Sequence, residues 1–135
     1  MAPELDPGSQ ADDAILSCLD MDVMEQLLGL DDGEVGLLEE MLGLYKEDTP
    51  DRIQALEHTL GTGEMNDMAD VAHAIKGSAG TMGAPKVRAV AAQLEAGGRT
   101  GKWEADGPYL LAQLKKTYEE SVVALETFLA RKKAN

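Results

Sequence analysis

The stretch MNDMADVAHAIKGSAGTM, residues 65–82, decides the fold class of this 135-residue chain. Its apolar residues recur every three or four positions, which is the spacing of one face of an α-helix. They are Met65, Met68, Ala72, Ile75, Ala79 and Met82. The spacing predicts a helix over residues 64–81 that buries this stripe, because a strand would need apolar residues at every second position.

The preceding segment continues the helical pattern across a proline. Apolar residues from Leu38 to Leu60 keep one helical phase through Thr49 and Pro50. This phase favours a single helix over about 32–60, kinked where proline removes a backbone donor. The alternative is two helices, the second with Thr49 as N-cap and Pro50 at its first position.

The same period predicts three more helices, and together they define the architecture. The predicted helices cover residues 21–29, 85–96 and 106–131. We interpret Gly97, Gly98 and Gly101 as marking the last connection. Four substantial amphipathic helices with short glycine-rich connections predict an all-α fold, an antiparallel four-helix bundle with a short N-terminal capping helix.

The chain divides into one domain and two short flanks. Residues 1–12 carry Pro, Gly, Ser and acids without periodicity, so we expect a flexible N-terminal lead-in there. We assign residues 13–132 to the helical bundle and residues 133–135 to a C-terminal tail.

Composition excludes several classes of function. Twelve Lys and Arg against 25 Asp and Glu give a net charge of −13, which argues against nucleic acid and anionic membrane surfaces as partners. No apolar run is long enough to predict a membrane span. A single cysteine, Cys18, excludes an intramolecular disulfide framework. We therefore expect a cytoplasmic protein and, since the charged faces leave no spare apolar stripe, a monomer.

The charge is unevenly distributed along the chain. Residues 71–94 contain no acid and three bases, Lys76, Lys86 and Arg88, whereas the rest of the chain holds nine bases and 25 acids. A +3 window in so acidic a chain indicates a site for an anionic partner.

His73 is the residue in this window that suggests chemistry. The face of its helix opposite the apolar stripe carries Asn66, Asp70, His73, Gly77 and Gly80. Glycine inside a helix costs about 1 kcal/mol relative to alanine, so two glycines beside an exposed histidine need a reason. Steric access is such a reason, because a bare helix surface lets another macromolecule reach the imidazole.

Phosphoryl transfer through histidine fits this arrangement. A neutral imidazole is nucleophilic, and the ordinary pKa of histidine, about 6.5, leaves much of it neutral at physiological pH. Lys76, one helical turn from His73, would offset the charge of an attached phosphoryl group. Gly77 would give access, and Ser78 would supply a hydroxyl nearby. A weaker reading is a helical metal site using Asp70 and His73, for which the sequence offers no further ligand.

At these residues the sequence resembles a known family. HAIKGSAGTMGA, residues 73–84, is similar to the motif of the histidine-containing phosphotransfer (HPt) domain. In that motif a large aliphatic residue, Lys, Gly and small residues follow the histidine, and a second Gly stands ten positions after it. The matching residues are His73, Ile75, Lys76, Gly77, Ser78 and Gly83.

The resemblance extends over roughly residues 20–130. LLEEMLGLYKEDTPDRIQALEHTL, residues 37–60, resembles the family's preceding proline-containing helix. Leu94 and Glu95, followed by the Arg-Thr-Gly of residues 99–101, resemble the end of its next helix. Ala79 stands where the family often has serine.

The resemblance implies a specific function. HPt domains are four-helix bundles that relay a phosphoryl group between receiver-domain aspartates in two-component signalling, without kinase activity of their own. It implies that His73 is the phospho-acceptor, that this chain holds no cofactor, and that Mg²⁺ and the acidic pocket belong to the partner receiver domain of a response regulator or hybrid sensor kinase. Candidate docking residues around the histidine are Asp70, Gly80, Lys86 and Arg88. The alternative is a non-catalytic helical adaptor that docks a receiver or sensor kinase.

Overall fold

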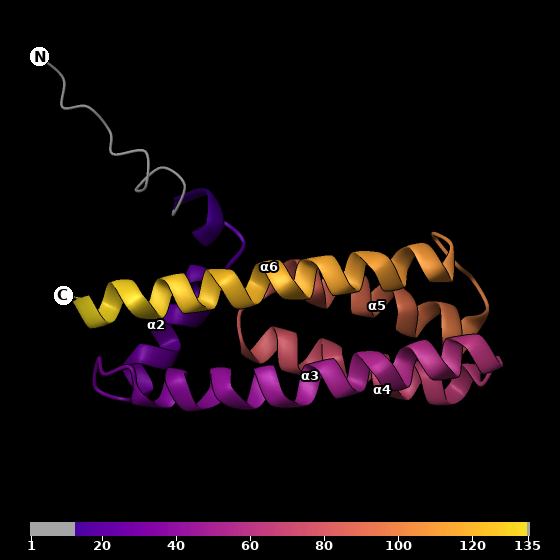
Figure 1. Cartoon of the computed structure of the whole chain (residues 1–135), viewed down its shortest axis with the longest axis horizontal. Coiled ribbons are helices and arrows are strands. Elements are labelled where there is room, and N and C mark those ends of the chain that lie inside the picture. The colour runs from indigo at the N-terminus through magenta and orange to yellow at the C-terminus, as the bar shows by residue number, and fades with distance from the viewer. Residues whose placement is uncertain (1–12, 135) are drawn as a thin grey trace, which may run out of the picture.

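The computed structural model describes residues 13–134, and every regular element within them is a helix. A helical turn at residues 13–16 precedes the five helices labelled in Figure 1. These are α2 (Met21–Leu30), α3 (Gly36–Thr62), α4 (Met65–Thr81), α5 (Pro85–Thr100) and α6 (Gly107–Ala134). The predicted all-α bundle is confirmed, whereas the predicted lead-in, residues 1–12, lies outside the described residues. Helix α6 includes Lys133 and Ala134, which we had expected in a C-terminal tail.

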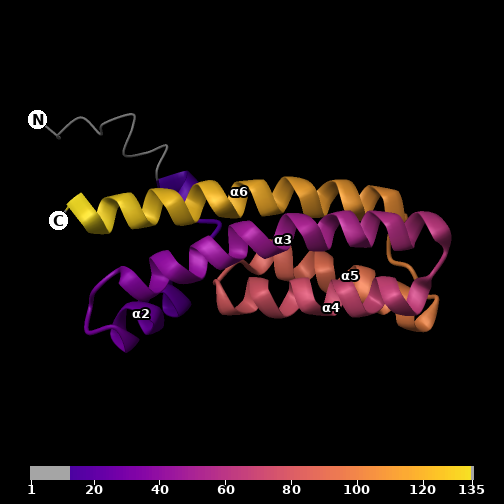
Figure 2. The ribbon, with the colours of Figure 1, turned by 60° about the horizontal axis from the view of Figure 1, so that its bottom comes forward.

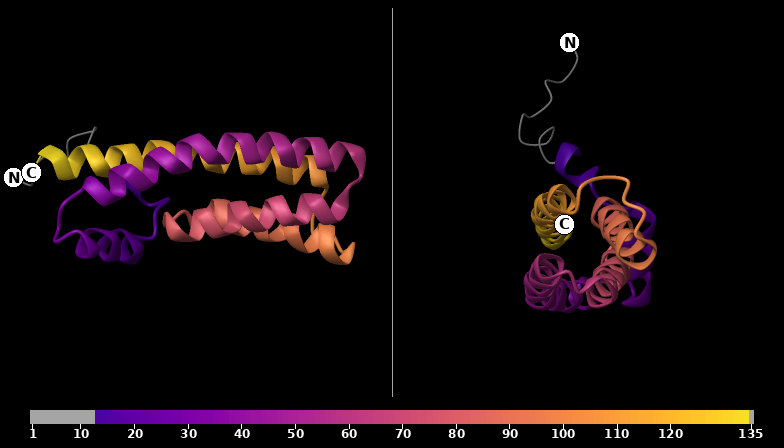
Figure 3. Two further views of the ribbon diagram at one scale, coloured as in Figure 1. Left: turned by 90° about the horizontal axis from the view of Figure 1, so that it is seen from below. Right: turned by 90° about the vertical axis from the view of Figure 1, so that its right-hand side faces the viewer.

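The two longest helices, α3 and α6, lie side by side and antiparallel along the whole molecule (Figures 1 and 2). Helices α4 and α5 lie against one half of this pair, and the end-on view in Figure 3 shows α3, α4, α5 and α6 arranged around a common axis. In the other half α2 covers the end of the bundle, as the predicted capping helix should. The functional residues discussed below all lie on the α4–α5 half.

The core has one apolar cluster in each half. The first joins α4 and α5 to the facing halves of α3 and α6, through residues such as Leu56, Met68, Ile75, Leu94 and Leu114. The second joins α2 to the start of α3 and the end of α6, through residues such as Met24, Leu38, Leu42, Leu125 and Phe128. Burying these side chains removes apolar surface from water, which is the main stabilising contribution to the fold.

A buried polar contact lies where the two clusters meet. The hydroxyl of Tyr45 is 2.7 Å from Ser121 Oγ, and the Tyr45 ring lies 5.2 Å from that of Tyr118. Burial raises the pKa of Tyr45 to about 12, so its hydroxyl stays protonated and can donate to Ser121.

Helix α3 is continuous across Pro50, as the unbroken apolar phase predicts. Thr49 is fully buried in the core stripe, so its side chain does not cap a second helix, and its hydroxyl is without a hydrogen-bond partner among the described residues. The helix begins at Gly36 rather than near residue 32, because Asp32 and Gly33 adopt left-handed backbone angles, with φ of 51° and 84°.

Helix α5 corrects a prediction. We expected it to end near residue 96, with Gly97 and Gly98 in the connection, but both glycines are helical. The helix ends at Thr100 and is followed by Gly101 as its C-cap, whose φ is 72°. A Cβ at Gly97 would lie 2.4 Å from the ring of Trp103, and one at Gly98 would lie 2.8 Å from the backbone oxygen of Met65. These glycines are therefore explained by close packing within a helix rather than by a turn.

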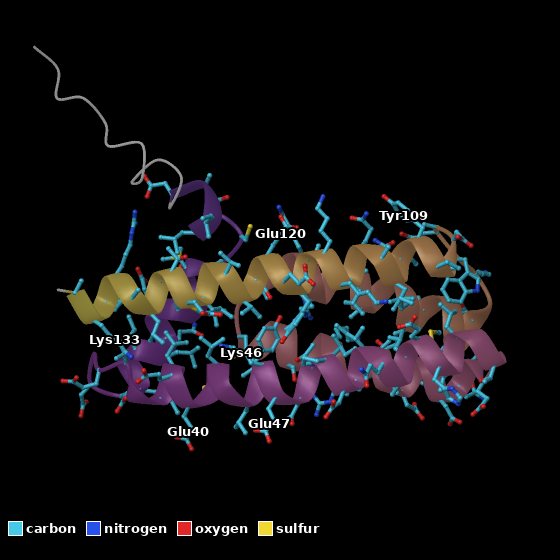
Figure 4. The ribbon with its side chains drawn as sticks, in the orientation of Figure 1. Glu40, Lys46, Glu47, Tyr109, Glu120 and Lys133 are labelled. Carbon is cyan, nitrogen blue, oxygen red and sulfur yellow. The ribbon has the colours of Figure 1, made fainter. Side chains whose placement is uncertain are left out.

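The acidic residues lie mostly on the outer surface of this scaffold. Glu40 and Glu47 point away from the bundle along α3, and Lys46 lies 3.5 Å from Glu126 of α6 (Figure 4). Across residues 13–134, none of the helices combines the length and the apolar character that crossing a membrane would require.

Candidate functional site

His73 lies in the middle of α4 on the face that turns away from the core. Its side chain is 64% exposed, whereas Ala72 and Ile75 beside it are fully buried and fix the rotation of the helix. Gly77 is one turn further along this face, and a Cβ built there would meet nothing within 4 Å. The predicted access to the imidazole is therefore present in the structure.

Helices α4 and α5 pack along a shared line that we call the α4–α5 seam. Glu95 of α5 contacts the imidazole across this seam. Its Oε2 lies 2.7 Å from His73 Nδ1, and its Oε1 lies 2.6 Å from Lys76 Nζ. The Glu95 side chain is only 15% exposed, because α5 packs along α4 (Figure 3). One carboxylate thus connects the two residues that the sequence singled out.

The charge state of Glu95 determines which imidazole nitrogen is available. The hydrogen bond from Lys76, and after it the hydrogen bond with His73, lower the pKa of Glu95. An ionised carboxylate can only accept hydrogen bonds, so His73 Nδ1 must donate. In the neutral ring the lone pair is then on Nε2, and Nε2 is the nitrogen that Glu95 does not hold.

Glu95 was not among the site residues predicted from the sequence. It is 22 residues from His73, and only the antiparallel register of α4 and α5 brings the two together. The available signal was the Leu94–Glu95 pair in the family resemblance. Helical periodicity places residues on a face of their own helix and cannot show which residue of the next helix lies opposite.

Ser78 does not join this site. Its Oγ accepts a hydrogen bond of 2.9 Å from Arg52 of α3, so it lies on the α3 side of α4 rather than beside His73. Five residues along a helix correspond to a rotation of about 140°, which is why a neighbour in sequence faces another way. The predicted hydroxyl near the phosphoryl group is therefore not provided by Ser78.

The four predicted docking residues have different surroundings. Asp70 accepts a hydrogen bond of 2.8 Å from Arg99, whose Nε is also 3.7 Å from Glu95. Gly80 lies under the side chain of Arg88, because a Cβ there would be 3.4 Å from the Arg88 Cδ and Nε.

Lys86 lies on the opposite side of α5, in a crevice with Thr117 and Glu120 of α6. The four residues therefore do not form one surface.

The alternative hypothesis of a metal site at Asp70 and His73 gains no third ligand from the structure. Residues 13–134 contain no group of three His, Cys, Asp or Glu that could hold an ion.

The sequence matches the model of the Hpt domain family over residues 40–131. No curated protein matches the chain.

Two solved structures share the fold. One is histidine-containing phosphotransfer protein B (HptB) from Pseudomonas aeruginosa PAO1, with a TM-score of 0.74 and 23% identity, covering 84% of this chain and 96% of that one. The other is the histidine-containing phosphotransfer domain of ArcB from Escherichia coli, also with a TM-score of 0.74 and 23% identity, covering 85% of this chain and 95% of that one.

Proposed function

The chain belongs to the Hpt domain family, whose function is histidine phosphotransfer in two-component phosphorelays, and we propose that His73 carries the phosphoryl group. The single observation that supports this assignment is the contact of 2.7 Å between His73 Nδ1 and Glu95, which leaves Nε2 of an exposed ring free to react.

The transfer step follows from this arrangement. The lone pair of His73 Nε2 attacks the phosphorus of a receiver aspartyl phosphate. An N–P bond forms while the P–O bond to the aspartate breaks, and the bonding pair leaves with the aspartate carboxylate. Nδ1 keeps its proton, so the positive charge that the ring gains lies beside the Glu95 carboxylate. Attack by the aspartate of a second receiver reverses these bond changes.

Lys76 and Gly77 support the reaction in different ways. The Lys76 ammonium has three donors, and Glu95 accepts one of them at 2.6 Å. The others are available to the oxygens of a phosphoryl group on His73, whose negative charge Lys76 offsets. Gly77 leaves the surface next to the ring bare, so the edge of a receiver domain can approach it.

The remaining components belong to the partner. Hpt domains interact with receiver domains and are carriers of phosphoryl groups rather than kinases. We propose that this chain has no kinase activity, that Mg²⁺ is bound by the receiver and not by this chain, and that the chain acts in the cytoplasm as a monomer without binding nucleic acid.

Labelling with a matched control tests the proposal. A receiver domain phosphorylated with labelled acetyl phosphate is mixed with Mg²⁺ and with wild type, His73→Gln or His58→Gln. His58 is the only other histidine and is exposed on α3, so it controls for the substitution itself. We expect acid-labile, base-stable phosphate on wild type and His58→Gln and none on His73→Gln.

Two outcomes would reject the assignment. Equal labelling of His73→Gln would move the phospho-acceptor elsewhere. Absence of labelling on wild type, together with receiver binding that survives His73→Gln, would favour the adaptor function instead.

A further inference from the structure

A surface cleft lies beside the His73 site, between the second half of α4 and the first half of α5. Its volume is about 510 Å³, and we call it the Arg88 cleft. Its floor consists of residues with small side chains or none, Ala79, Gly80, Gly83, Ala84, Ala89 and Ala92. The cleft begins at Lys76, the residue that shares Glu95 with His73. A protein seated on His73 would therefore also cover it.

Arg88 is the free cation of this cleft. The other bases along the α4–α5 seam are engaged, Lys76 with Glu95 and Arg99 with Asp70. Within residues 13–134 the Arg88 guanidinium, although exposed, makes no hydrogen bond or ion pair. Its side chain lies across Gly80 instead. A guanidinium presents a planar fork of donors that matches a carboxylate, so Arg88 is ready to accept one from outside.

The charge of the cleft also favours an acidic partner. Its single acid is Asp20, whose carboxylate accepts hydrogen bonds from the backbone nitrogens of Asp22 and Val23 and so caps α2. Lys76 and Arg88 lie within the acid-free window of residues 71–94, in a chain whose net charge is −13. The positive charge of this window contrasts with the negative charge of the rest of the chain, and it complements an acidic surface on a partner.

We propose that the Arg88 cleft is a docking subsite for the receiver domain. Arg88 pairs with a receiver carboxylate that is not the phosphorylated aspartate, and the small-residue floor accepts an apolar side chain next to it. This inference rests on the proposed function, because it assigns the partner of the same site. It places Arg88 and Gly80 in the interface and leaves Lys86, which faces α6, and Asp70, which is paired with Arg99, outside it.

The experiment compares two charge reversals on one helix. Arg88→Glu and Lys86→Glu change the net charge equally, but only the first lies in the cleft. Transfer from a phosphorylated receiver that labels wild type is followed over a range of receiver concentrations. We expect Arg88→Glu to raise the half-saturating concentration by about tenfold and leave the maximal transfer rate unchanged, because it weakens docking and does not touch the imidazole. We expect Lys86→Glu to behave nearly as wild type.

A second variant tests the floor without changing charge. Ala92→Leu fills part of the cleft, so it should also raise the half-saturating concentration. Raising the salt concentration should weaken docking of wild type more than docking of Arg88→Glu. Circular dichroism confirms that each variant is folded, and calorimetric binding to the unphosphorylated receiver measures docking independently of transfer.

The results separate the two proposals. If Arg88→Glu and Lys86→Glu have the same effect, or if Arg88→Glu lowers only the maximal rate, the docking subsite is wrong while the role of His73 stands. If His73→Gln is labelled like wild type, the role of His73 is wrong, and calorimetry still decides the cleft. Equal affinities of Arg88→Glu and wild type in calorimetry would overturn the subsite in either case.

Discussion

Glycines at the two ends of the α4–α5 seam have opposite roles. At one end Gly97 and Gly98 let Trp103 and the start of α4 approach to distances that no Cβ would allow. At the other end Gly77 has nothing within 4 Å of its Cβ position and leaves the helix surface bare beside His73. Glycine lowers helix stability in both places. Whether a glycine allows close packing or leaves a surface accessible is therefore decided by what lies opposite it, and not by the residue itself.

Gly98→Ala should have the largest effect on stability. The new Cβ would lie 2.8 Å from the backbone oxygen of Met65 and 3.0 Å from the Cβ of Ala69, and neither atom can yield unless α4 moves. We expect the free energy of unfolding, measured with urea, to fall by about 2 kcal/mol.

Gly43→Ala is the matched control. Gly43 lies inside α3, and a Cβ there meets nothing within 4 Å. Alanine should therefore raise the free energy of unfolding by roughly 0.5–1 kcal/mol. A loss of stability in Gly43→Ala as large as in Gly98→Ala would show that close packing does not distinguish the two positions.

Gly77→Leu should slow transfer while leaving the fold intact. The new side chain points into open space on the face of His73, so it obstructs a partner rather than the core. We expect the rate of phosphotransfer from a receiver to fall by about tenfold, equivalent to about 1.4 kcal/mol. Gly43→Leu, on the exposed side of α3, should transfer at the wild-type rate. Unchanged transfer by Gly77→Leu would remove the access argument.

Gly97→Ala should cost less stability than Gly98→Ala. Its Cβ would meet the ring of Trp103 at 2.4 Å, but Trp103 belongs to the connection between α5 and α6 and can move without shifting a helix. We expect a loss of about 1 kcal/mol. Trp103 is the only tryptophan of the chain, so its fluorescence reports the displacement as a shift to longer wavelength. An unaltered emission spectrum would contradict the predicted ring contact.

These glycines also show which features of the fold could be predicted from the sequence and which could not. Helical periodicity predicted the helices, the continuity of α3 through Pro50 and the exposed position of His73, because each depends on the spacing of residues within one helix. Gly97 and Gly98 were wrongly placed in a connection. A glycine pair before Arg99 looks the same in sequence whether it breaks a helix or packs one against Trp103.

The site shows the same limit. His73, Lys76 and Gly77 lie on one helix, and their mutual placement follows from its geometry. Glu95 was not predicted as part of the site, because its contact depends on how two antiparallel helices align. Ser78 was predicted near His73 by its position in the motif, but its angular position on α4 takes it to Arg52.

Glu95 lies between these two ends of the seam. Its substitution should give the smallest change in the free energy of unfolding, and the most specific one, because the change depends on pH. The hydrogen bond from Lys76 is the first cause of its lowered pKa, which lies below the ordinary value of 4.5. A carboxyl group whose pKa is lower in the folded than in the unfolded chain stabilises the fold above the unfolded pKa. This contribution is lost as the pH falls through the folded value.

The unfolding free energy of wild type minus that of Glu95→Gln should therefore decrease as the pH falls below about 4.5. Taking the difference cancels the titration of the other acids, which Glu95→Gln retains. Glu47→Gln is the control for the loss of one carboxylate, because Glu47 points away from the bundle on α3 (Figure 4). A difference for Glu95→Gln that does not change over this pH range would mean that the carboxylate does not hold Lys76 and His73 in solution. The bare surface at Gly77 would then give access to a ring that nothing orients.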